Sequence, residues 1–296
     1  MAGKSLRVCN ILRNFANMKH VYVVLLVVLL AGCKEETPTF QTEVLNSFTP
    51  VKNQGRSSLC WAYAMLAAIE TEHIMRGDSV NLSAAYVSEM VEREKDAPPT
   101  KRGVGQTLLN MIAKYGVVPY ESMRTTEVPA PRWAFMLGSK YTPQEFARSV
   151  CAPGEYIGLG SDSKHPYYQR YVFDVPDNWE RNQLFNVPAD TLLAVTERAV
   201  RQGHGVCWEG DISEIGFDWQ QGVARTSFFS GSTTDDHCMA IVGLARDAEG
   251  CRYVIMKNSW GKGNAYHGLM YMQFDYFMKK TLAVYLPKEA AGVERL

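Results

Sequence analysis

The chain has 296 residues, which is long enough for one large domain or for two lobes that share a cleft. Hydrophobic residues make up 46% of the chain and aromatic residues 11%, proportions that exclude a disordered or fibrous protein. Basic and acidic residues number 31 each, so the charge gives no reason to expect a nucleic-acid partner.

The first segment with a clear pattern is an apolar run at residues 21–31. A helix needs about 20 apolar residues to span a bilayer, so this shorter run predicts the core of a signal peptide. The run leads into the sequence LAGC, which ends at Cys33 and resembles a bacterial lipobox. We therefore expect cleavage before Cys33 and lipidation of its thiol. The alternative is a plain secretory leader that happens to contain this cysteine. Met18 resembles a natural start, and translation from it would leave out residues 1–17.

This reading divides the chain into three parts. Residues 1–32 are the expected lipoprotein signal peptide, residues 33–47 a polar and flexible tether, and residues 48–296 the folded domain. A lipidated Cys33 makes the membrane an expected partner. It predicts a protein of the cell envelope, anchored to a bacterial membrane on the periplasmic face or at the cell surface.

Apolar residues at helical spacing predict helices in the first half of this domain. The clearest helix lies at residues 61–76, with Ser57 or Ser58 as the expected N-cap and Gly77 just past its end. Residues 119–190 are rich in proline and aromatic residues and show no readable period. Further helices are expected at residues 84–94, 107–114 and 189–202.

Short β-like runs dominate the chain after residue 205, and turn signals such as GKGN at residues 261–264 separate them. Helices first and antiparallel strands later predict an α+β protein with two lobes. The expected strands lie at residues 206–208, 239–244, 253–256, 269–274 and 282–286.

Four of the seven cysteines lie neither in the leader nor at the candidate nucleophile described below. Two disulfides among them are possible in an oxidising compartment. None of their spacings is that of a zinc site, so we expect no metal, and we expect mostly buried free thiols. These four are Cys151, Cys207, Cys238 and Cys251.

Cys60 is a candidate nucleophile because it lies at the start of the helix expected at 61–76. A thiol there faces unpaired N–H groups and the positive end of the helix dipole, which favour the thiolate. The side-chain amide of Gln54 is close enough in sequence to join the Cys60 backbone N–H in an oxyanion hole. A cysteine at a helix start is more often a small buried hydrophobic residue, so the assignment depends on the surrounding sequence.

That surrounding sequence, NQG at residues 53–55 and CWAYA at 60–64, resembles the active-site segment of papain-like cysteine peptidases. DHCMAIVG at 236–243 resembles the family's histidine strand, and KNSWG at 257–261 its asparagine turn. The resemblance covers most of residues 48–286. It implies an α+β, papain-like two-lobed fold, with a helical N-terminal lobe, an antiparallel β-barrel-like C-terminal lobe and the active site in the cleft between them.

The resemblance also implies a role for each matching catalytic residue. Cys60 would attack the scissile carbonyl as a thiolate, and His237 would hold the proton and deliver it to the leaving amine. Asn258 would orient the imidazole. Gln54 would stabilise the oxyanion.

Four other positions are implied to support this site. Trp260 would shield the bond between His237 and the asparagine from water, and Trp61 would support the nucleophile. Gly103 and Gly105 resemble the glycine-rich loop along which a substrate backbone lies. No cofactor is implied.

Four segments resemble the bleomycin hydrolase and aminopeptidase C branch of the family. Cys60 and His237 are further apart than the roughly 130–150 residues usual in the family, which predicts an insertion at about 119–190. Well-known members of the branch are cytosolic hexamers, but a shorter chain with a lipid leader need not share either property, so its oligomeric state is left open. The segments are KYGVVP at 114–119, YTPQEF at 141–146, VPDNW at 175–179 and WEGD at 208–211.

The leading hypothesis is a cysteine peptidase that acts on peptide or protein substrates and leans to aminopeptidase activity. In that branch a C-terminal tail enters the cleft, and the tail at residues 287–296, at about 3.3 Å per residue, is long enough to do so. The alternatives are an endopeptidase or wall-peptide hydrolase of the same fold, or a catalytically inactive, surface-binding lipoprotein.

Overall fold

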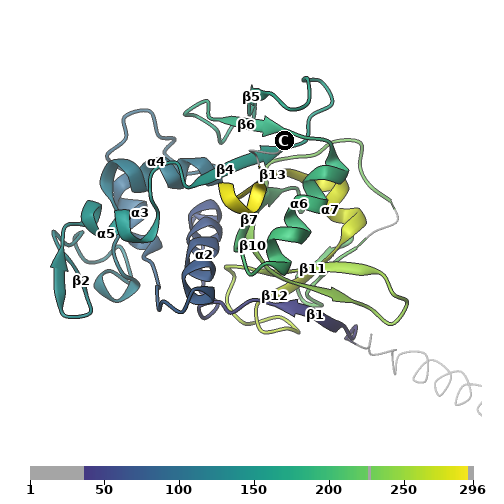
Figure 1. Ribbon diagram of the computed structural model, residues 1–296, viewed down its shortest axis with the longest axis horizontal. Coiled ribbons are helices and arrows are strands. Elements are labelled where there is room, and N and C mark those ends of the chain that lie inside the picture. The colour runs from purple at the N-terminus through teal and green to yellow at the C-terminus, as the bar shows by residue number, and fades with distance from the viewer. Residues whose placement is uncertain (1–36, 226–227, 293–296) are drawn as a thin grey trace, which may run out of the picture. The chain divides into compact units, whose positions relative to one another are not determined.

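The computed structural model describes residues 37–225 and 228–292 (Figure 1). The predicted signal peptide and Cys33 lie outside these residues. From Thr39 onward the chain forms one compact unit. No helix within the described residues is long and apolar enough to cross a membrane.

The helices separate into an N-terminal group and a later group. The first group includes α2, a 16-residue helix with buried residues on every side, as expected of a helix inside a core. The helices are α2 (Cys60–Met75), α3 (Ala84–Val91), α4 (Gly105–Tyr115), the 3-10 helix η1 (Tyr120–Ser122), α5 (Pro143–Val150), α6 (Ala189–Arg201), α7 (Phe274–Lys280) and α8 (Lys288–Ala291).

The strands form one large sheet and a small hairpin of β2 and β3. The strands are β1 (Gln41–Leu45), β2 (Ala134–Met136), β3 (Ser139–Tyr141), β4 (Tyr156–Gly160), β5 (Arg170–Val172), β6 (Gln183–Asn186), β7 (Val206–Gly210), β8 (Phe217–Asp218), β9 (Val223–Ala224), β10 (His237–Arg246), β11 (Arg252–Lys257), β12 (Leu269–Gln273) and β13 (Thr281–Pro287).

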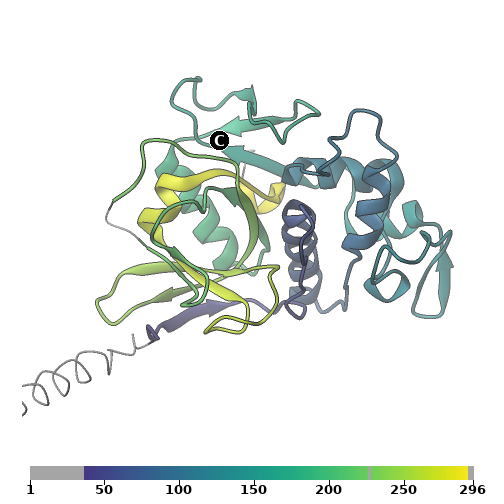
Figure 2. The ribbon, with the colours of Figure 1, turned by 180° about the vertical axis from the view of Figure 1, so that it is seen from behind.

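The large sheet has the order β5-β6-β4-β13-β7-β10-β11-β12-β9-β8, and β1 adds to β10. It is antiparallel except for the pairs β4–β6 and β9–β12. On one face α2 packs against β10 and β7. On the other face α6 and α7 cover a second apolar core (Figure 2). The α+β two-lobed fold expected from the sequence is confirmed.

The predicted tether at 33–47 is wrong over its second half. Residues 41–45 form β1, which pairs antiparallel with β10. Asn46 is buried and its side-chain amide donates a hydrogen bond to Val200 O at 3.0 Å. The segment is held by backbone pairing with β10, by ion pairs of Glu43 with Arg201 and Arg246, and by Val44, which packs against an apolar core. None of these contacts shows as a local pattern in the sequence.

The N-cap expected at Ser57 or Ser58 is also wrong. The cap position of α2 is Leu59, whose side chain makes no capping bond. In the region without a readable period, α5 begins with a capping box between Thr142 and Glu145, and the sequence TPQE carries that signal. The same region contributes β4, β5 and β6, which extend the sheet beyond β13.

Candidate active site

Cys60 is the first residue of α2, and its partly exposed thiol lines a cleft of about 180 Å³. The helix start carries no side-chain cap, so its first N–H groups are left for whatever binds at the sulfur. The cleft lies where α2 meets β10, because His237 and Cys238 at the start of β10 line it too.

The groups around Cys60 favour its thiolate form. A hydrogen bond from the Cys238 thiol, followed by the hydrogen bond and positive charge of His237, keeps the pKa of Cys60 well below its usual range, although burial opposes the shift. The sequence pointed to the helix dipole and to His237. It did not single out Cys238, which directly follows the histidine in the strand.

His237 and Asn258, which the resemblance pairs, lie side by side in the structure. The two side chains meet at 2.8 Å between Nε2 and Oδ1. The same Oδ1 accepts the backbone N–H of Ser259 at 2.7 Å, so this atom is the amide oxygen and His237 Nε2 must be the donor. The other ring nitrogen, Nδ1, is therefore the one left to face Cys60.

Trp260 covers this pair. Its ring lies 4.6 Å from the His237 ring, centroid to centroid, with the planes tilted by 36°. Trp219 and Phe217 pack edge-on against Trp260, at 5.3 and 6.1 Å. These two aromatic residues were not singled out from the sequence, and they hold the shielding ring in place.

Gln54 lies in the cleft with Cys60. Its Oε1 accepts from Ser259 Oγ at 2.6 Å, and its Nε2 donates to Ser57 O at 2.7 Å. The backbone N–H of Gln54 donates to Ser259 O at 2.7 Å, which ties the residue to the asparagine turn. One of the two amide N–H groups is thus committed to Ser57, and the other is left for an oxyanion.

The two glycines predicted to line the cleft behave differently. Gly103 lines the cleft, as does Trp61. A Cβ at position 103 would lie only 3.1 Å from the ring of Trp61. Gly105 does not, and this prediction is wrong. It is the buried first residue of α4, where a Cβ would lie 2.5 Å from the ring of Tyr285. Its small size is needed for packing between the lobes, and the spacing of two glycines cannot distinguish that from a substrate contact.

Charged residues that the sequence analysis did not assign complete the cleft: Arg102, Asp177, Asp235 and Asp236. Arg102 Nε binds Asp177 Oδ2 at 2.6 Å. Asp177 belongs to the segment VPDNW, and Glu209, which lies buried nearby, belongs to WEGD. Both segments resemble one branch of the family, but that resemblance assigned no role to Asp177 or Glu209.

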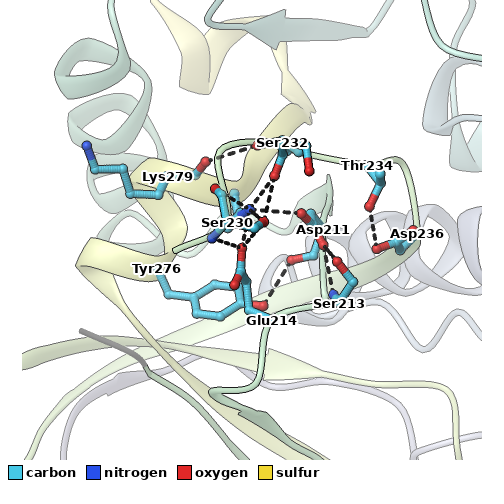
Figure 3. Close-up of polar contacts among 11 residues, drawn as sticks. Asp211, Ser213, Glu214, Ser230, Ser232, Thr234, Asp236, Tyr276 and Lys279 are labelled. Carbon is cyan, nitrogen blue, oxygen red and sulfur yellow. Dashed lines mark hydrogen bonds and ion pairs between the residues drawn. The ribbon is translucent and has the colours of Figure 1, made fainter. Parts of the chain in front are cut away.

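The segment before β10 is anchored by a buried polar network (Figure 3). Lys280, which is only 1% exposed, donates to Asp211 Oδ2 at 3.0 Å, to Ser232 O at 2.5 Å and to Glu214. Tyr276 Oη donates to Asp211 O at 3.1 Å. Ser232 and the residues after it lead directly into His237. The network therefore holds in place the segment that positions His237.

Within the described part of the chain, the cysteines other than Cys60 are free thiols. Cys151, Cys207 and Cys238 are buried, as expected, and Cys251 is exposed. Burial raises the pKa of Cys151 to about 12. Cys60 is thus distinguished from these thiols by its environment.

One cluster among the described residues offers three ligand atoms to a metal, at Glu72, His204 and Glu289. The guanidinium of Arg76 already binds Glu72 Oε1 at 2.9 Å and Glu289 Oε1 at 2.7 Å. This cluster is an ion-pair network at the surface, and its residues do not line the cleft.

The chain is similar to plant cysteine proteases. It is 24% identical to ananain of Ananas comosus over 73% of this chain, 27% to the senescence-specific cysteine protease SAG12 of Arabidopsis thaliana over 79%, and 26% to chymopapain of Carica papaya over 75%. These matches cover 49%, 56% and 51% of the three proteins, so the chain spans about half the length of the curated relatives it matches. No family model matches the chain.

Two solved structures show the same fold. PepW from Lactobacillus rhamnosis HN001 has a TM-score of 0.67 at 14% identity, over 100% of this chain and 95% of that one. The ragweed pollen allergen Amb a 11, a cysteine protease in its proform, has a TM-score of 0.53 at 18% identity, over 86% of this chain and 66% of that one. The sequence similarity is thus to cysteine proteases, and the two solved structures share the fold of this chain.

The environment of Cys60 leads to a prediction about its reactivity. Alkylation by iodoacetamide requires the thiolate, so Cys60 should react at full rate well below pH 9, with a midpoint that rises in Cys238→Ala because the largest stabilising hydrogen bond is lost. Cys207→Ala, which removes another buried thiol, is the matched control and should leave the midpoint in place. The pH profile of labelling at Cys60, followed by peptide mass spectrometry, measures this. Equal midpoints in Cys238→Ala and the unaltered protein would contradict the assignment.

Proposed function

We propose that this protein is a cysteine peptidase in which Cys60, His237 and Asn258 hydrolyse peptide bonds. The observation that carries the proposal is the tautomer fixed by Asn258, which turns His237 Nδ1 toward a thiol whose pKa is held low. A merely structural cysteine in a core has no need of either feature. A nucleophile paired with an oriented base has both.

The proposed reaction begins with attack of the Cys60 thiolate on the carbonyl carbon of the peptide bond. The oxyanion that forms accepts the free N–H of Gln54 Nε2 and the Cys60 backbone N–H. His237, protonated on both ring nitrogens, gives its Nδ1 proton to the leaving amine, and a thioester to Cys60 remains. Neutral His237 then takes a proton from water, the hydroxide attacks the thioester, and the acid and thiolate are released.

Two substitutions test this proposal. Cys60→Ala should abolish hydrolysis, as removal of a nucleophile typically costs about 10⁶ in kcat. Gln54→Ala should lower kcat by about 10²–10³, the usual cost of one oxyanion donor. Cys251→Ala removes an exposed free thiol and should change nothing. Cleavage of a mixed peptide library, read by mass spectrometry, is the measurement. Full activity in Cys60→Ala would refute the peptidase proposal and leave the inactive, surface-binding alternative.

Within this activity, we propose an aminopeptidase related to bleomycin hydrolase and aminopeptidase C. Segments at 114–119, 141–146, 175–179 and 208–211 support the branch by resemblance. The first part of the C-terminal tail is held against the domain. Helix α8 packs on α6 with Ala290 and Ala291 buried, and Arg198 donates to Ala291 O at 3.1 Å. A truncation test must therefore spare α8.

Peptides with free and acetylated N-termini distinguish the two modes of cleavage. For an aminopeptidase, acetylation removes the charge that the enzyme recognises, and kcat/KM should fall more than about ten-fold. The variant lacking residues 293–296 should lose this discrimination if the tail supplies it. Equal cleavage of free and acetylated peptides by the intact chain would favour the endopeptidase alternative, and preferential turnover of wall fragments the wall-peptide hydrolase.

We also propose that Cys33 carries a lipid and holds the protein to the cell envelope. The support is the sequence LAGC after a short apolar run. In bacteria fed labelled palmitate, the protein should be labelled and recovered with membranes, and Cys33→Ala should be neither. Cys9→Ala is the control, since Cys9 lies before the proposed start at Met18. A labelled Cys33→Ala protein would refute the lipid site.

A further inference from the structure

One end of the cleft is acidic. The contacts sort its lining into two groups, because Gln54 and Trp260 are tied together through the asparagine turn. Arg102, Asp177 and Asp235 form the other group: Arg102 binds the Asp177 carboxylate, and its second nitrogen donates to Asp235 O at 2.9 Å. Cys60 lines the same cleft as both groups.

The single guanidinium at this end does not satisfy its carboxylates. Neither of those two bonds of Arg102 reaches the side chain of Asp235. Asp235 Oδ2 is buried and faces the carboxyl group of Glu209. Asp236, by contrast, accepts from Thr234 Oγ1 at 2.8 Å (Figure 3). Asp235 is thus a cleft carboxylate to which Arg102 makes no side-chain bond.

Glu209 backs Asp235 from inside the protein. It lies on β7, in register with Cys238 on β10, and is 0% exposed. Its Oε2 accepts the backbone N–H of Gly105 at 3.2 Å, and its carboxyl group also lies within hydrogen-bonding reach of the Tyr285 and Asp235 side chains. Burial and then the Asp235 charge raise the pKa of Glu209 well above its usual range. Burial, together with the charges of Asp177 and Cys60, raises that of Asp235 to about 7.

This arrangement costs free energy in the empty cleft. Adjacent buried carboxyl groups oppose each other's ionisation. The segment cannot relieve the cost by swinging outward, because Lys280 fixes it through Ser230 and Ser232. A positive charge delivered to Asp235 would recover the cost.

The geometry also indicates which half of a substrate would bring that charge, provided that the proposed peptidase function holds. His237 protonates the leaving amine, and its ring is covered by Trp260. The departing half of the peptide therefore lies toward Trp260, and the acyl half lies toward Asp235 and Asp177.

We propose that Asp235, backed by Glu209 and flanked by Asp177, is a subsite for a positively charged nitrogen in the acyl half of the substrate. The nitrogen is either the free α-amino group of the peptide or the side chain of a lysine or arginine residue close before the scissile bond. Asp235 is then a specificity-determining residue next to the nucleophile, and peptides with such a group are the preferred substrate class.

The first experiment compares isosteric substrates. Acetylated peptides carry lysine or norleucine at one of the two residues before the scissile bond, and a second pair carries leucine with a free or an acetylated N-terminus. The ratio of kcat/KM within each pair reports recognition of the charge alone. In Asp235→Asn we expect at least one of the two ratios to fall about ten-fold or more, with a smaller fall in Glu209→Gln.

The pattern identifies the source of the nitrogen. Loss in the lysine pair indicates a basic side chain, and loss in the N-terminal pair indicates the α-amino group. Asp96→Asn, an exposed carboxylate away from the cleft, is the matched control and should keep both ratios. Ratios in Asp235→Asn and Glu209→Gln equal to those of the unaltered protein would overturn the proposal.

A second measurement does not require peptidase activity. Cationic 2-bromoethylamine and neutral iodoacetamide both alkylate Cys60, and the ratio of their rates senses negative charge beside the thiol. Asp235→Asn should lower this ratio several-fold. If the unaltered protein cleaves no peptide but the ratio falls, the peptidase proposal fails and the cation subsite stands. If peptides are cleaved but the ratio and both substrate pairs are unchanged, the subsite fails alone.

Discussion

The wholly buried carboxylate of Glu70 on α2 ties together the elements that carry the two halves of the active site. Lys52 binds it at 2.6 Å, Lys257 Nζ lies 3.7 Å away, and the backbone N–H of Leu82 donates to it at 2.7 Å. Lys257 ends β11 and directly precedes Asn258, whereas Glu70 is on the helix that begins at Cys60. Burial lowers the pKa of Lys257 to about 8. Breaking such a buried pair leaves an uncompensated charge, so this network restrains the distance between nucleophile and orienting group.

Groups that favour a negative charge on Cys60 and groups that oppose it lie close together in the cleft. Cys238 and His237 stabilise a negative sulfur, while Asp177, Asp235 and Glu209 place negative charge beside it. Arg102, which binds Asp177, offsets part of that charge. A site devoted only to making a thiolate would have no such acids. Their presence is understandable if the cleft must also receive a cation, and the hydrogen bonds of Cys238 and His237 lower the pKa of Cys60 in spite of them.

Elements with strong local signals were predicted from the sequence, and those that depend on distant partners were not. The helix at 61–76 appears as α2 because its apolar residues cover every side. Strand β1 was predicted to be a tether because the segment around it is mostly polar and its partners, β10 and Arg201, lie far away in the chain. Strand β4, buried on both faces, includes two glycines packed against Tyr285 and Tyr171, and no period of two can be seen in it.

The sequence by itself led to the proposed chemistry: Cys60, His237, Asn258 and Gln54 are residue types that fit one joint use, in segments that resemble those of one family. Spacing in the chain is enough for that, because each segment places its side chain through local structure. Only the tertiary structure decided that Gly105 packs under Tyr285, that Cys238 donates to the nucleophile and that Asp235 meets Glu209. These facts depend on which faces of β7, β10 and α4 are brought together, and that is a property of packing between elements.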